Sequence, residues 1–187
     1  HLLNEDLMSV HMTQLSSDDI GLLAQRGVQV VHCPKSNLKL ASGMCPVGAL
    51  LAASVNVAIG TDGAASNNNL DLLSEAHTAA LLAKGLSADP CALDAFTALE
   101  MLTINGARAL KMDHAIGSIE IGKQADLVAL DLYAPETQPL HNVLSQLIYA
   151  ASSHQFTDVW VAGKILMKSG ALTTLDLSSM LEAAESW

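Results

Sequence analysis

The sequence predicts an α/β fold: a parallel sheet with crossover helices, followed by a smaller β-containing part. Short apolar runs at 7–10, 28–31 and 55–60 alternate with helical patterns, which is typical of parallel strands joined by helices. The pattern then changes to turn-rich segments and a hairpin. We therefore predict two parts, one at 1–113 and a second at 114–187.

In the first part, local signals indicate where the elements begin and end. Ser16 can cap a helix that has two acidic residues in its first turn, and Gly27 can end that helix. Pro34 prevents the second strand from continuing. A loop is therefore expected at 33–37 and an irregular stretch at 38–43.

The remaining patterns extend the alternation and then break it. Three strand–helix units are consistent with part of a barrel or of an open sheet, because three strands cannot close an eight-stranded barrel. The further elements that the sequence predicts are a helix at 47–53, a helix at about 70–85, a helix at 91–104 broken by Asn105-Gly106, a strand at 125–131, a helix near 141–151, a hairpin turning at Ala162-Gly163 and a terminal helix at 175–187.

The charge balance argues against some classes of partner. Nineteen Asp and Glu face nine Lys and Arg, and the formal net charge is −10. Nucleic acids and anionic membranes attract clustered Lys and Arg, so we expect neither as a partner. No apolar run approaches the ~20 residues of a membrane span. Cys33, Cys45 and Cys91 form no CxxC pair, which is typical of reduced thiols in a cytoplasmic protein.

Three side chains that can carry chemistry stand at the carboxyl ends of the predicted strands: His11, His32 and Asp62. In a parallel sheet these ends line one edge, so the three could face one site. Imidazoles and carboxylates bind metals and transfer protons. Each residue also has a plainer interpretation, because Asp before Gly often forms a turn and a His at a strand end is often a hydrogen-bonded packing residue. Spacing alone leaves both interpretations open.

Longer sequence segments are more informative than the spacing of these three residues. The segments VHMTQLSSDDI, VVHCPKSNLKLASG and VAIGTDGAASNNNLDLL occur in this order, followed by NGARAL, IGSIEIGKQADLVALDL and VWVAGK. Together they closely resemble the amidohydrolase superfamily. The resemblance covers nearly the whole chain, and it is to the branch of aminohydrolases that act on methylthioadenosine, S-adenosylhomocysteine, triazines and related amino-heterocycles.

The resemblance implies that the chain is the C-terminal part of a metal-dependent (β/α)8 barrel, about strands six to eight, plus part of a small β-sandwich domain. His11, His32 and Asp62 would end these three strands. Asp62 would bind one divalent metal, expected to be zinc, accept a proton from the attacking water and contact the substrate. His11 would position that water. Asn37 would bind substrate, and His32 and Ser36 would lie on the same side of the site.

The other metal ligands of this superfamily are absent from the chain. The resemblance implies a His-x-His pair on strand one and a His on strand five. His1 cannot replace the latter, because it lies only ten residues before His11 and precedes no strand. The histidines that remain are expected on helices or loops, as surface or packing residues: His77, His114, His141 and His154.

The implied function is hydrolytic deamination of an amino-heterocycle, with this chain supplying only the C-terminal part of the site. 5-Methylthioadenosine or S-adenosylhomocysteine would give the inosine-type product and ammonia. Two alternatives remain open. The chain could be a non-catalytic, truncated amidohydrolase segment, or the same chemistry could act on guanine, cytosine or a triazine. The expected partner is a small nucleoside-like molecule, and the resemblance also suggests a homo-oligomer.

Overall fold

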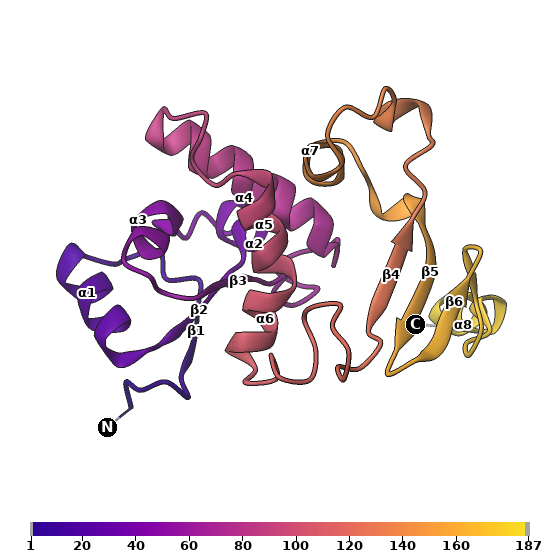
Figure 1. Ribbon diagram of the computed structural model, residues 1–187, viewed down its shortest axis with the longest axis horizontal. Coiled ribbons are helices and arrows are strands. Elements are labelled where there is room, and N and C mark those ends of the chain that lie inside the picture. The colour runs from indigo at the N-terminus through magenta and orange to yellow at the C-terminus, as the bar shows by residue number, and fades with distance from the viewer. Residues whose placement is uncertain (1, 186–187) are drawn as a thin grey trace.

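A three-stranded parallel sheet forms the amino-terminal part of the molecule in a computed structural model, which describes residues 2–185 (Figure 1). The strands lie in the order β1-β2-β3, and Val10 pairs with Val31 while Val31 pairs with Ala58. The three strands therefore end at one edge of the sheet. Their bounds are β1 (Met8–Val10), β2 (Gln29–His32) and β3 (Val57–Ile59).

Helices join the parallel strands, as the alternating pattern predicts. The predicted cap of the first helix is confirmed, because the Ser16 hydroxyl accepts from the Asp19 N–H at 3.2 Å and the Asp19 carboxylate accepts from the Ser16 N–H at 2.9 Å. Gly27 ends this helix with a φ of 66°. The four helices are α1 (Ser17–Arg26), α2 (Pro34–Lys39), α3 (Val47–Ala52) and α4 (Leu72–Ser87).

Helix α2 corrects the sequence prediction of a loop at 33–37 and an irregular stretch after it. Pro34 occupies the first helical position, where its missing N–H costs nothing and its fixed φ favours the helix. The proline that ends β2 therefore also starts α2. As a result Ser36 and Asn37 sit on a helix, with 0% and 2% of their surface exposed.

Helix α5 (Ala95–Leu102) begins later than the sequence predicts. The predicted start is Cys91, but the structure caps the helix with Asp94, whose carboxylate accepts from the Thr97 N–H at 2.8 Å. The preceding residues form a turn, in which the Asp89 carboxylate accepts from the Cys91 N–H at 2.8 Å. Local side-chain acceptors, rather than Pro90 just before the predicted start, decide where the helix starts.

The predicted break at Asn105-Gly106 is also wrong. The chain breaks at Thr103, with φ −123° and ψ −94°, and Asn105-Gly106 lie inside α6 (Ile104–Ala109). Asn105 is 8% exposed, and its Nδ2 donates to the Val57 carbonyl at 3.1 Å. This bond to β3 uses the side-chain amide that would otherwise compete with the helix backbone.

An antiparallel sheet in the order β4-β5-β6-β7 follows. The hairpin predicted at Ala162-Gly163 is confirmed, and both residues have positive φ, 49° and 77°, as the tightest hairpin turns require. The terminal helix is confirmed over α8, while 186–187 lie outside the described residues. The bounds are β4 (Leu127–Leu130), η1 (Pro135–Thr137), α7 (Val143–Tyr149), η2 (Ser153–Gln155), β5 (Phe156–Val161), β6 (Lys164–Lys168), β7 (Ala171–Leu172) and α8 (Leu177–Glu185).

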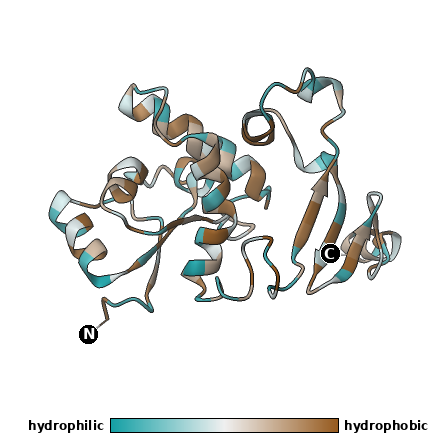
Figure 2. Cartoon of the chain, viewed as in Figure 1, coloured by the Kyte–Doolittle hydropathy of each residue, from teal (hydrophilic) through white to brown (hydrophobic). Residues whose placement is uncertain are grey.

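The hydrophobic core lies between the parallel sheet and its helices. Val30, Leu50, Val57, Met101 and Ile148 are fully buried there, and burial of one such side chain contributes about 1.5–3 kcal/mol. Helix α7 packs against α4 and α5, so the second part of the chain contributes to this core. Figure 2 shows the β4 arrow as mostly hydrophobic.

Within residues 2–185, no helix is both long and apolar enough to cross a membrane.

Candidate active site

β3 leads directly into the segment that carries Asp62. At Gly60 a Cβ would lie 2.8 Å from Val31 Cγ1 and 3.2 Å from Cys33 Sγ, so glycine is needed for the chain to pass this close to β2. Asp62 then adopts a left-handed backbone with φ 61°. Asp tolerates this region better than most residues, and non-glycine residues held there cluster at functional sites.

The Asp62 carboxylate is held by three hydrogen bonds. Oδ2 accepts from the Ser36 hydroxyl at 2.7 Å and the Ser66 hydroxyl at 2.6 Å, and Oδ1 accepts from the Gly63 N–H at 2.7 Å. The hydroxyl of Ser66, then that of Ser36 and the Gly63 N–H, lower the pKa of Asp62 to about 2. The group is therefore ionised at neutral pH. Its side chain is 31% exposed, so it can still reach a ligand.

His11 faces this carboxylate from the end of β1. Its backbone is left-handed, with φ 71°, and its N–H donates to the Val31 carbonyl at 3.0 Å. Nε2 lies 3.7 Å from Asp62 Oδ2, and Nδ1 lies 2.8 Å from Asn37 Oδ1. Of the three strand-end residues predicted to face one site, the structure brings His11 and Asp62 together, and Asn37 lies beside His11.

The contact with Asn37 selects one tautomer of His11. With the amide oriented as assigned, Asn37 Oδ1 accepts a hydrogen from Nδ1 of His11, which leaves the lone pair of a neutral ring on Nε2. Nε2 lies 3.7 Å from Asp62 Oδ2, which is too long for a direct hydrogen bond. The arrangement can accept a proton from a molecule bound between the two side chains.

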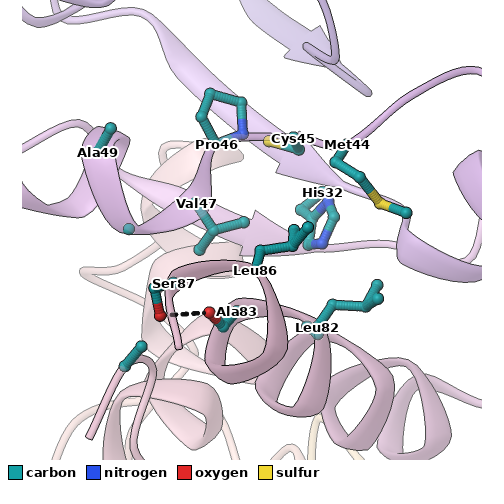
Figure 3. Close-up of a pocket in the computed structure, with 13 residues that line it drawn as sticks. His32, Met44, Cys45, Pro46, Val47, Ala49, Leu82, Ala83, Leu86 and Ser87 are labelled. Carbon is teal, nitrogen blue, oxygen red and sulfur yellow. Dashed lines mark hydrogen bonds between the residues drawn. The ribbon is translucent and has the colours of Figure 1, made fainter. Parts of the chain in front are cut away.

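His32 differs from His11 in its surroundings. It is 3% exposed, and within residues 2–185 its Nδ1 has no hydrogen-bond partner. Burial, and then the charge of His11, lower the pKa of His32 to about 4. Figure 3 shows it at an apolar pocket of about 210 Å³, with Met44, Cys45 and Leu86 on the walls. His32 is thus neutral at pH 7.

Ser66 and Glu75 are parts of the site that the sequence analysis missed. Ser66 stands four residues after Asp62 in a polar loop, and this short spacing could have suggested the contact. Glu75 is 0% exposed although it carries a carboxylate. The sequence did contain an indication of Glu75, because this acidic residue stands between Leu73 and Ala76, which are both buried on the same helix.

The other histidines lie outside this cluster. His77 Nδ1 lies 3.2 Å from the carbonyl oxygen of Ile148, so this residue joins α4 to α7. His114, His141 and His154 are exposed. These positions agree with the expectation of packing and surface roles.

A zinc site in a protein needs at least three donor side chains. Among residues 2–185 there is no group of three or more His, Cys, Asp or Glu side chains that could hold a metal ion. Asp62, ionised and partly exposed, fits one ligand of a zinc site. Residues 2–185 therefore fit one ligand position and not a complete zinc site.

Curated relatives match nearly all of this chain but only part of their own length. Residues 1–166 match the profile of the amidohydrolase family. The 5-methylthioadenosine/S-adenosylhomocysteine deaminase of Teredinibacter turnerae is 52% identical over 178 residues, which are 95% of this chain and 40% of that protein. The chain thus spans about two fifths of this relative.

Two solved structures likewise match nearly all of this chain but only about two fifths of their own length. An adenosine deaminase from Xanthomonas campestris with bound zinc superposes with a TM-score of 0.98 at 60% identity, over 100% of this chain and 42% of that chain. The atrazine chlorohydrolase from Arthrobacter aurescens, also with zinc, superposes with a TM-score of 0.91 at 26% identity, over 98% and 41%. The predicted fold class, a part of an amidohydrolase barrel with a small antiparallel sheet, is confirmed. The chain belongs to the amidohydrolase family.

Proposed function

We propose that this chain is the C-terminal part of a metal-dependent hydrolytic deaminase that acts on amino-heterocycles. The observation that carries the proposal is the ionised Asp62 carboxylate, fixed at the end of β3 and 3.7 Å from His11 Nε2. The name of the Teredinibacter turnerae relative supports 5-methylthioadenosine or S-adenosylhomocysteine as substrate. The products would be the inosine-type compound and ammonia.

Asp62 has two roles in this proposal. It is the metal ligand of the chain, and it is the carboxylate that accepts a proton from the attacking water and carries it towards the leaving ammonia. A bound zinc ion would lower the pKa of water to about 7 and so supply hydroxide at neutral pH. Three hydrogen bonds hold the Asp62 carboxylate in one orientation, which favours a fixed ligand geometry.

His11 and Asn37 act together beside Asp62. The Nε2 lone pair of His11 orients the attacking water, and the hydrogen bond from Nδ1 to Asn37 Oδ1 holds the ring. Asn37 is 2% exposed, so its part in substrate binding is the orientation of His11. The proposed substrate is a small nucleoside-like molecule, and a cytoplasmic location and a homo-oligomeric state remain predictions.

The test replaces Asp62 by Asn in a complete barrel, a polypeptide in which residues 1–187 form the C-terminal part. We expect zinc content to fall and the deamination rate to drop roughly 10²-fold or more, because the amide is neutral. Asp94→Ala is the control, since Asp94 only caps α5. Metal analysis and ammonia release measure both effects. Unchanged zinc and rate in Asp62→Asn would show that this assignment is wrong.

A second substrate class has one supporting observation, the superposition with atrazine chlorohydrolase at 26% identity. A panel of methylthioadenosine, guanine, cytosine and an amino-triazine, scored for ammonia release by the complete barrel, separates the classes. A barrel that binds zinc but releases no ammonia from any of them would favour the non-catalytic alternative.

A further inference from the structure

Glu75 is a carboxylate in the hydrophobic core. It lies on α4 beside Leu73 and Ala76, and its exposed fraction is 0%. Burial, the largest effect on this group, raises its pKa. Removal of a carboxylate from water is costly unless hydrogen bonds replace the lost hydration. The partners of Glu75 therefore indicate what its burial achieves.

Each oxygen of Glu75 accepts a hydrogen bond from a different segment that follows a strand. Oε2 accepts from the Lys35 N–H at 3.1 Å, at the start of α2. Oε1 accepts from Asn67 Nδ2 at 2.7 Å, in the loop after β3. Asn67 Nδ2 also donates to the Thr61 carbonyl at 2.9 Å. One buried carboxylate thus connects the segments that follow β2 and β3, which we call the two loops although the first includes the start of α2.

Both loops carry the groups that hold Asp62. Lys35 directly precedes Ser36, whose hydroxyl donates to Asp62 Oδ2 at 2.7 Å. Asn67 directly follows Ser66, whose hydroxyl donates to the same oxygen at 2.6 Å. Glu75 touches neither Asp62 nor its donors, but it fixes the backbone on either side of them.

We propose that Glu75 is a positioning residue: by binding Lys35 and Asn67 at once, it fixes the two loops that orient the Asp62 carboxylate. Because the role of Asp62 belongs to the proposed function, this inference rests on it. A core residue that served packing alone would need no charge and no contact with two separate loops. The two donors explain why an acidic residue, and not an apolar one, stands at this position.

Glutamine has nearly the same shape but the wrong hydrogen-bonding groups. Glu75 faces two N–H donors, and its carboxylate can accept from both. A Gln side chain has one accepting oxygen and one NH2 donor. In Glu75→Gln, either Lys35 or Asn67 must therefore face another donor and lose its bond. One of the two loops is released while the packing volume is kept.

The test compares Glu75→Gln and Asn67→Ala with Asn105→Ala in the complete barrel. Asn105 is also a buried polar residue, but it bonds to β3 at Val57 and touches neither loop. We expect all three to lower stability. Only the first two should weaken zinc binding, by roughly 10-fold or more, and lower kcat more than they change KM. Asn67→Ala keeps the test valid if Glu75→Gln fails to fold.

A second measurement needs neither zinc nor turnover. The Gly63 N–H donates to Asp62 Oδ1, and the Asn67 N–H donates to the Gly63 carbonyl at 2.9 Å. Hydrogen exchange of these amides in metal-free protein should be at least about 10-fold faster in Glu75→Gln and Asn67→Ala than in Asn105→Ala. Equal exchange and equal zinc affinity in all three variants would overturn the inference. Faster exchange together with an Asp62→Asn variant that keeps zinc and rate would overturn the proposed function alone.

Discussion

His11 and Asp62 both have left-handed backbones, with φ of 71° and 61°. His11 directly follows β1, and Asp62 comes shortly after β3 in the same sheet. Such conformations cost about 1–3 kcal/mol each and turn the two side chains towards each other. The strain is thus located where the proposed chemistry needs it. The backbone of Met12, with φ 47°, extends the strained segment after β1.

A substitution of His11 separates positioning of the attacking water from metal binding. In the complete barrel we expect His11→Gln to keep its zinc but lose roughly 10²-fold in kcat, because glutamine lacks the ring that Asn37 holds beside Asp62 to position the attacking water. His114→Gln, at an exposed position, should change neither. Steady-state kinetics and metal analysis make the comparison, and loss of zinc in His11→Gln would mean that His11 is a ligand.

The buried His32 predicts a dependence of stability on pH. Its pKa is lowered from 6.5 to about 4, so between these values the unfolded chain binds a proton that the folded chain does not. Stability is then full above pH 6.5 and falls as pH drops towards 4, by at most about 3 kcal/mol. His32→Gln should flatten this slope in urea titrations at pH 7, 5.5 and 4.5. An unchanged slope would show that another group causes it.

The sequence predicted candidate site residues at strand ends and missed those that connect distant parts of the fold. Asp62 and His11 were found because an apolar run that ends in a polar residue is visible locally. Glu75 binds the backbone of a residue forty positions earlier. That contact depends on how α4 packs against α2, which no local pattern encodes.

At the scale of elements, α1 is defined by its cap. The reciprocal bonds between Ser16 and Asp19 satisfy N–H groups that the helix itself leaves unpaired. Ser16→Ala should therefore lower the free energy of unfolding by about 1 kcal/mol. Ser17→Ala, one position later in the helix, is the matched control and should have less effect. Denaturant titration measures both, and equal values would argue against the capping box.

Two of the misplaced elements, α2 and α6, share one cause. Pro34 and Asn105-Gly106 were interpreted as breakers, yet both positions are helical. Pro34 is at the one helical position that suits proline, and Asn105 is held by its bond to β3. A residue such as proline, asparagine or glycine indicates only a local preference against helix. The position in the helix and the tertiary contacts decide whether the helix nevertheless forms. The hairpin at Ala162-Gly163 was predicted correctly because its turn is determined locally.

At the scale of the whole molecule, the parallel sheet has unpaired edges. In the described part of the chain, β1 and β3 each pair only with β2, and relatives of this chain extend well beyond the matched region. Met8 and Val10 on β1 are 43% and 47% exposed. Three strand–helix units are consistent with part of a barrel or with an open sheet, and it was the resemblance to the amidohydrolase superfamily that predicted the partial barrel. The sequence could not reveal which strands would cover these edges.

The open edges and the single carboxylate ligand lead to one prediction for the isolated 187-residue chain. It should bind zinc well below stoichiometry, because its described residues contain no group of three or more possible ligands. It should also self-associate as concentration rises, since unpaired strand edges recruit further strands. The complete barrel should bind stoichiometric zinc without such association. Metal analysis and sedimentation velocity compare the two. Stoichiometric zinc and turnover in the isolated chain would instead require that it assembles a full site from its own residues.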